Sequence, residues 1–252
     1  MYIVLLTALG VGGATLVGSL IGFCFKNISH KFSDLILSFA AGVMLCASVF
    51  GLIEPSLSYG GNFAVITTIL GVFCGAFALN LIDKAVPHLH RMSGTEIEEH
   101  TEKNEKLNKV LLFVMAIAIH NLPEGIASGV GFGTGNTLEA LTIAGGIALQ
   151  NIPEGMVIIA PMLASGISKK RTLLIASVTG FVEIIGTFLG YFAVSISSAI
   201  LPFALSFAGG TMLYVISDEM IPETHAHGTE RGATYSLLIG FCLMLLIDFY
   251  LG

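Results

Sequence analysis

Two copies of one short motif bring metal-binding side chains into apolar sequence. The chain contains IAIHNLPEGI and, thirty positions later, IALQNIPEGM. His120 and Glu124 are four residues apart and therefore share one face of a helix, and Gln150 and Glu154 repeat that spacing. Imidazole nitrogen, carboxylate oxygen and amide oxygen are suitable ligands for Zn²⁺ and its first-row neighbours. The pair of motifs therefore predicts a site for a divalent cation.

Further polar or sulfur groups are expected at the same depth. Asn121 and Asn151 lie one position beyond the first motif residues, about 100° around the helix, and could face a second, adjoining site. At 1.5 Å of rise per residue, His120, Gln150 and Met44 each lie about 14 Å from the start of their apolar segment. Glu183 lies about 16 Å from the start of its own segment. Met44 is either a soft ligand or core filling. Three glutamates at mid-membrane depth would each cost at least about 2.5–3.5 kcal/mol, which favours a functional site over packing alone.

Two other groups of polar residues are weaker candidates. Asp218 and Glu219 are followed by further acidic and histidine side chains, and they predict either an exit or regulatory site or ordinary interfacial residues. His88 and His90 lie in a hydrophilic connector, residues 84–109, rich in glutamate. This connector is either a solvated loop or a weak metal-collecting loop.

Composition indicates the elements that must position these residues. Of 252 residues, 54% are hydrophobic and 11% charged, and the mean hydropathy is +0.88. Soluble domains carry about 25% charged residues, so this chain cannot supply a soluble surface. A membrane-spanning helix needs roughly 20 apolar residues. We expect an all-α integral membrane protein, a single domain over residues 1–252, with eight spans at about 3–25, 34–53, 63–83, 110–130, 139–165, 172–195, 201–221 and 233–251.

The basic residues set the orientation. All 11 lysines and arginines lie in or beside the first, third, fifth and seventh loops. The positive-inside rule assigns those loops to the cytoplasm, so both termini are expected outside a cytoplasmic (inner) membrane. No basic patch exists beyond these loops, which argues against a nucleic-acid partner, and membrane lipid is the expected surroundings.

Internal repeats suggest how the helices are related. The sequence SFAAGVML in the second span recurs as SFAGGTML in the seventh, 168 positions later, with six of eight positions identical. The spans run in opposite directions, as do the fourth and fifth spans that carry the paired motifs. Related segments in opposite directions indicate an inverted-topology repeat, in which spans 1–3 correspond to spans 6–8.

The motifs resemble those of the ZIP family, the Zrt/Irt-like metal transporters, and most closely its prokaryotic branch. The similarity covers the eight spans, the outside termini, the histidine-bearing third loop, HNLPEG and QNIPEG. Many relatives carry histidine where this chain has Gln150, and some carry aspartate in place of Asn151. Neutral amides lower the negative charge and ligand strength of the site.

The resemblance implies a binuclear site and an activity. The implied first position has His120, Glu124, Gln150 and Glu154, with Met44 nearby. The implied second position has Asn121, Asn151 and Glu183, and shares the two motif glutamates. The family further implies influx of Zn²⁺, with Fe²⁺, Mn²⁺ and Cd²⁺ as alternatives, a 3+2+3 helix arrangement, a homodimer and an elevator-like movement. It implies no organic cofactor and no enzymatic activity.

Other functions make different demands on the sequence. An intramembrane metalloprotease needs HExxH, but Asn121 follows His120 and Glu124 stands in place of the second histidine. A proton-coupled transporter of a non-metal substrate could use the glutamates as relays but would not need the His/Asn pairing. An exporter of the same metals is a third alternative. No GxxxxGK[ST] motif is present, which argues against ATP-driven transport by this chain alone.

Overall fold

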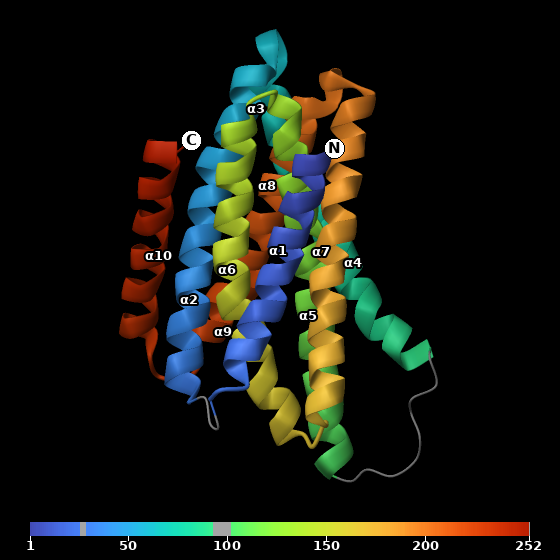
Figure 1. The fold of residues 1–252 in the computed structure, drawn as a ribbon, viewed down its shortest axis with the longest axis vertical. Coiled ribbons are helices and arrows are strands. Elements are labelled where there is room, and N and C mark those ends of the chain that lie inside the picture. Colours follow the sequence, from blue (N-terminus) through green and yellow to red (C-terminus); the bar gives the residue numbers. More distant parts are fainter. Residues whose placement is uncertain (26–28, 93–101, 252) are drawn as a thin grey trace.

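The fold is a bundle of long helices, seen here in a computed structural model (Figure 1). The structure describes residues 1–25, 29–92 and 102–251, with side chains for all of these except 85–92, 102–114 and 116. Every regular element in the described residues is helical, as expected from the sequence.

The long helices are α1, α2, α4, α5, α6, α7, α8 and α10, and α3 and α9 are short continuations. Their bounds are α1 Tyr2–Gly22, α2 His30–Cys46, α3 Glu54–Tyr59, α4 Ala64–Met92, α5 Glu102–Val130, α6 Thr137–Ala164, α7 Lys169–Ile196, α8 Leu201–Val215, α9 Ile221–Thr224 and α10 Glu230–Leu251. Two π-helical turns, Ala47–Ile53 and Ile216–Met220, join α2 to α3 and α8 to α9. Single 3₁₀ turns cover Gly61–Phe63, Gly131–Thr134 and Ser198–Ile200.

Seven helical segments of the described chain are long and apolar enough to cross a membrane. They are Tyr2–Gly22, His30–Tyr59, Gly61–Lys84, Thr137–Ala164, Lys169–Ile196, Ser198–Thr224 and Glu230–Leu251. Each matches an expected span to within a few residues. The remaining expected span, 110–130, lies inside α5, which has 29 residues. The multi-pass helical architecture expected from composition is therefore confirmed.

The polar connector between the third and fourth spans is more helical than expected. α4 continues to Met92 and α5 begins at Glu102, so helix covers both ends of the segment 84–109. A rule based on apolar length ends a span at the membrane surface, although polar residues can continue the same helix into water. His88 and His90 lie in the last turns of α4, but their side chains, like residues 93–101, lie outside the description.

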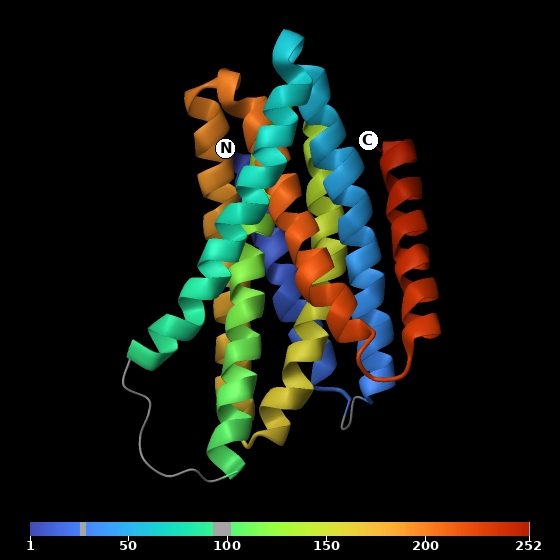
Figure 2. The ribbon, with the colours of Figure 1, turned by 180° about the vertical axis from the view of Figure 1, so that it is seen from behind.

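The helices are arranged so that the paired motifs lie in the middle of the bundle. Both termini lie at one end of the molecule (Figure 1). The most extensive packing is between α5 and α7, α1 and α6, α4 and α8, and α2 and α10, and α1 also packs along α7. α10 stands at one side, and α4 leans away on the other (Figures 1 and 2). Both outer helices expose large apolar residues such as Phe73 and Phe249, as lipid-facing helices do.

Candidate functional site

The polar residues of both motifs are buried where α5, α6 and α7 meet. The side chains at positions 121, 124, 150, 151 and 183 belong to residues at most 1% exposed, and Glu154 and His120 are 7% and 8% exposed. Buried polar groups in an apolar environment must be hydrogen-bonded or bound to a cation to be tolerated. The hydrogen-bond partners of each polar side chain therefore indicate which of its atoms remain free to bind a cation.

Glu183 on α7 lies between the two asparagines. Asn121 donates from Nδ2 to Glu183 Oε1 at 2.5 Å, and Asn151 donates from Nδ2 to Glu183 Oε2 at 2.6 Å. Thr15 on α1 donates from Oγ1 to the same Oε1 at 2.8 Å. The structure thus brings together the three residues predicted for the second position and adds a fourth from α1.

A second contact joins the two motifs directly. Gln150 donates from Nε2 to Glu124 Oε1 at 2.7 Å. The first residue of the α6 motif therefore meets the fifth residue of the α5 motif. The two helices are antiparallel, so identical spacings place these positions at the same depth.

His120 contacts a residue that the sequence predicted only weakly. Its Nε2 lies 2.7 Å from Glu219 Oε1, in the π-helical turn after α8. The sequence predicts Glu219 as part of an exit or regulatory site or as an interfacial residue, apart from the paired motifs. α8 and α9 run obliquely across the bundle (Figure 2), and Glu219 contacts His120 of the first motif. Asp218 also reaches this region and lines the adjoining cavity.

Several oxygen atoms of the site have no hydrogen-bond donor. Within the described residues, the buried acceptors without a partner include Asn121 Oδ1, Glu124 Oε2, Gln150 Oε1, Asn151 Oδ1 and Glu154 Oε1. Leaving a buried acceptor unsatisfied costs about 1–3 kcal/mol, and more when it is charged. Five such oxygens on two neighbouring helices form a set that a cation would satisfy.

The glycine of each motif lets the helices approach at the site. A Cβ atom at Gly125 would overlap the backbone of Glu183, and one at Gly155 would overlap the carbonyl of Thr15. Small residues at such positions are what permits close packing of membrane helices. The motif glycines thus place α5 against Glu183 and α6 against Thr15.

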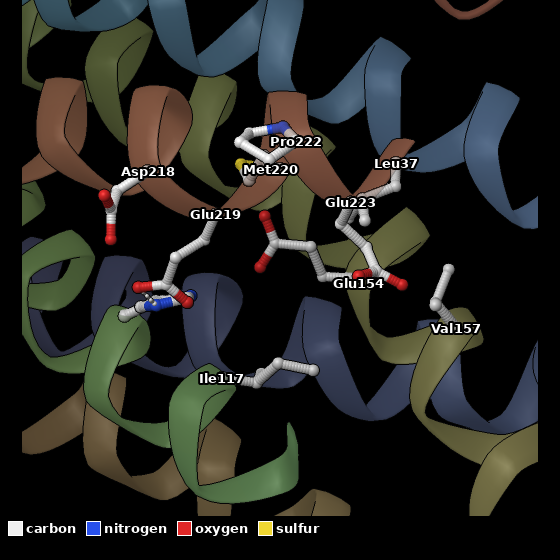
Figure 3. A pocket seen from close by; sticks show the side chains of 10 residues that line it. Leu37, Ile117, Glu154, Val157, Asp218, Glu219, Met220, Pro222 and Glu223 are labelled. Carbon is white, nitrogen blue, oxygen red and sulfur yellow. Dashed lines mark hydrogen bonds and ion pairs between the residues drawn. The ribbon is translucent and has the colours of Figure 1, made fainter. Parts of the chain in front are cut away.

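A cavity of about 400 Å³ adjoins the site (Figure 3). Its lining residues are Leu37, Ile117, His120, Glu154, Val157, Asp218, Glu219, Met220, Pro222 and Glu223. The carboxylates of Glu154, Glu219 and Glu223 project into the same space (Figure 3). Two of the lining residues, Pro222 and Glu223, belong to α9, and α9 lies in the half of the bundle away from both termini (Figure 1).

Met44 has apolar surroundings, unlike the polar candidates. Met44 lies in a buried apolar cluster that includes Ile147, one turn before Gln150. No group of three or more His, Cys, Asp or Glu side chains among the described residues is assembled as a metal-binding cluster. In the site, His120 is paired with Glu219, and the carboxylates of Glu124 and Glu183 accept hydrogen bonds from side-chain amides.

Thr15 was missed by reasoning from residue types, because a threonine in an apolar span is unremarkable alone. A signal did exist in the repeat. Thr15 and Glu183 are 168 positions apart, the same offset that relates the SFAAGVML and SFAGGTML segments. In the predicted inverted repeat, Thr15 would be the counterpart of Glu183.

Comparisons with known proteins identify the family. The profile of the family described as ZIP Zinc transporter matches residues 91–248. Zinc transporter GufA of Myxococcus xanthus is 40% identical over 254 residues, covering 98% of both chains. Zinc transporter ZIPB of Bordetella bronchiseptica is 37% identical, over 95% of this chain and 78% of its own. Zinc transporter ZupT of Chlorobaculum parvum is 34% identical, over 92% and 91%. This chain, a multi-pass helical membrane protein, therefore belongs to the ZIP family.

Proposed function

We propose that this protein carries divalent transition-metal ions, zinc foremost, across the cytoplasmic membrane into the cell. The observation that carries the proposal is the set of unpartnered oxygens on α5 and α6 beside His120. Oxygen and imidazole ligands accept Zn²⁺, and also Fe²⁺, Mn²⁺ and Cd²⁺. The relatives described above are all named zinc transporters, which supports zinc as the substrate.

The substrate ion would occupy one or both of two adjoining positions. The first has His120 and Glu154 at the cavity and the Gln150–Glu124 pair behind them, with Met44 as a nearby soft ligand. The second has the oxygens of Asn121 and Asn151 beside Glu183. Glu124 and Glu154 would serve both positions, since each keeps an oxygen without a donor.

The position of the cavity supports release of the ion into the cytoplasm. The lining of the cavity includes Glu154 on α6 and Pro222 and Glu223 on α9, and α9 lies in the half of the bundle away from both termini (Figure 1). The amino-terminal ends of α7 and α10, which carry Lys169, Lys170, Arg171 and Arg231, belong to that half. The positive-inside rule makes it cytoplasmic. Asp218, Glu219 and Glu223 would then give the departing ion negatively charged surroundings.

An inverted repeat in a 3+2+3 arrangement accounts for how the helices pair. Exchanging spans 1–3 with 6–8, and 4 with 5, converts the α5–α7 contact into the α6–α1 contact. The same exchange converts α4–α8 into α10–α2. These are the four most extensive contacts, and they form two equivalent pairs. Such symmetry supports alternating access, in which each half reaches the other's arrangement. The elevator-like movement and the homodimer remain predictions from the family resemblance.

Uptake into proteoliposomes tests the proposal. Vesicles loaded with a zinc-sensitive dye should show saturable uptake through the unchanged protein. Glu124→Ala and Glu154→Ala should each reduce uptake at least about 100-fold, because each removes an anionic ligand in a low-dielectric site. Glu230→Ala, at an exposed position, is the control and should transport normally. Normal uptake by both site variants, present in the membrane in equal amount, would contradict the assignment.

The same assay separates the remaining alternatives. A proton-coupled carrier of a non-metal substrate would show no metal uptake above protein-free vesicles. An exporter would accumulate metal only in vesicles with the opposite protein orientation. An intramembrane metalloprotease is disfavoured by the family membership and by the absence of HExxH from the sequence.

A further inference from the structure

Thr15 and Glu183 face each other at the centre of the molecule. They occupy equivalent positions of the two repeats, 168 residues apart, and their side chains are hydrogen-bonded at 2.8 Å. Thr15 is 1% exposed and Glu183 is 0% exposed. One turn away, Gly12 and Gly180 are equivalent at the same offset, and a Cβ atom on either would overlap the carbonyl of the other. Close backbone packing beside this hydrogen bond therefore holds α1 against α7.

The Glu183 carboxylate is nearly filled with donors. Oε1 accepts from Thr15 and Asn121, and Oε2 accepts from Asn151. A carboxylate offers about four acceptor positions, two on each oxygen. Thr15 and Asn121 therefore occupy Oε1, and Oε2 is left with one position directed elsewhere. Without the threonine hydroxyl, the carboxylate could rotate and present either oxygen.

This arrangement determines which end of each asparagine faces the cation position. An amide has an oxygen acceptor on one side and an NH₂ donor on the other. Asn121 and Asn151 both direct Nδ2 at Glu183, and Asn151 Nδ2 also donates to the carbonyl of Val11 at 3.2 Å. Their Oδ1 atoms then point away from Glu183 and have no donor. Only the oxygen of an amide can coordinate a metal ion here, so the orientation is decisive.

We propose that Thr15 is a positioning residue for the metal site: it holds the Glu183 carboxylate so that both asparagines turn their amide oxygens to the cation. The proposal rests on the function proposed above and deepens it. Thr15 itself contacts Glu183 and not the ion. Its effect should therefore fall on metal affinity more than on the rate of the transport cycle.

Thr15→Val removes the hydroxyl while keeping the shape of the side chain. Its loss should raise the KM for Zn²⁺ uptake about ten-fold, as expected when one hydrogen bond to a charged group is removed. The maximal rate should stay within about two-fold, since no ligand is lost. Thr15→Ser keeps a hydroxyl and should restore KM. An unchanged or lower KM in Thr15→Val would overturn the proposal.

A matched control is available on α7. Thr179 is 2% exposed, lies four residues before Glu183, and donates only to the carbonyl of its own helix at Ala176. Thr179→Val therefore removes an equally buried hydroxyl without touching the carboxylate, and KM should not change. An equal rise in KM in Thr179→Val would show a general packing effect and overturn the assignment to Thr15.

Two further measurements keep the outcome unambiguous. If Thr15→Val does not reach the membrane, Thr15→Ala, which adds no bulk beside Gly155, should show the same rise in KM. Glu154→Ala runs in the same assay. An active Glu154→Ala would contradict the transport site itself, whereas an inactive Glu154→Ala together with a normal Thr15→Val would overturn only the role of Thr15.

Discussion

The α5 and α6 copies of the motif have the same spacing but opposite surroundings. In α5 the first residue, His120, lines the cavity, and the fifth, Glu124, is buried. In α6 the first residue, Gln150, is buried and the fifth, Glu154, lines the cavity. Because the helices are antiparallel, one cavity from one end reaches complementary halves of the two motifs. An imidazole therefore lies on the cavity side and an amide on the far side.

The largest difference between the copies should appear at their first residues. His120→Ala removes an imidazole ligand, and we expect zinc affinity to fall roughly 100-fold, at the upper end of losses seen for supporting groups. Gln150→Ala removes a neutral amide and should cost about ten-fold by the same comparison. Isothermal titration of the purified protein measures both. Equal losses would mean that the two copies contribute alike.

The motif glycines should behave alike in both copies. Gly125→Ala and Gly155→Ala each place a methyl group against backbone that cannot move aside, and overpacking of this kind costs about 1–3 kcal/mol. Both variants should therefore lower the melting temperature in detergent by similar amounts. Gly145→Ala, where a Cβ atom meets nothing within 4 Å, is the control on α6. Destabilisation of only one motif variant would break the equivalence of the copies.

Glu219 belongs to the α5 side alone, since its contact is with His120. Glu219→Gln keeps the size of the side chain but removes the charge that orients the imidazole. A roughly ten-fold loss of zinc affinity is expected, the lower end of the range for a carboxylate that supports a metal-binding histidine. Glu223→Gln removes a charge from the same cavity without that contact and should change affinity less. A larger loss of zinc affinity in Glu223→Gln than in Glu219→Gln would contradict this assignment, because it would make the charge of Glu223 the more important of the two.

The smallest effect should come from making the first residues equal. Gln150→His introduces a second imidazole beside Glu124, and we expect zinc affinity to rise a few-fold, because nitrogen is a stronger ligand for Zn²⁺ than a neutral amide oxygen. The maximal transport rate should fall, since a tighter site releases its ion more slowly. Initial rates at saturating zinc measure this. An unchanged rate would show that release is not limited by ligands on this side.

Sequence alone predicted the helices and most of the site. Apolar length gave the spans, and the spacing in HNLPEG and QNIPEG gave the shared helix faces. It could not give the His120–Glu219 contact, because helix tilt depends on packing between distant segments. Nor did residue type identify Thr15, whose role depends on which residue lies opposite. That information was present only as the 168-residue offset, and interpreting it requires knowing that α1 and α7 pack together.

The size of the cavity has a consequence for the ion's own water. A volume of about 400 Å³ accommodates roughly a dozen waters at about 30 Å³ each. In the proposed transport, an ion that leaves Glu154 would therefore have room to regain a hydration shell inside the cavity. Gln150 and Glu124, in contrast, are 0% and 1% exposed, and neither lines the cavity. If zinc binds at the proposed site, we therefore expect its water to be stripped between the two motifs, and discrimination between metals to take place there.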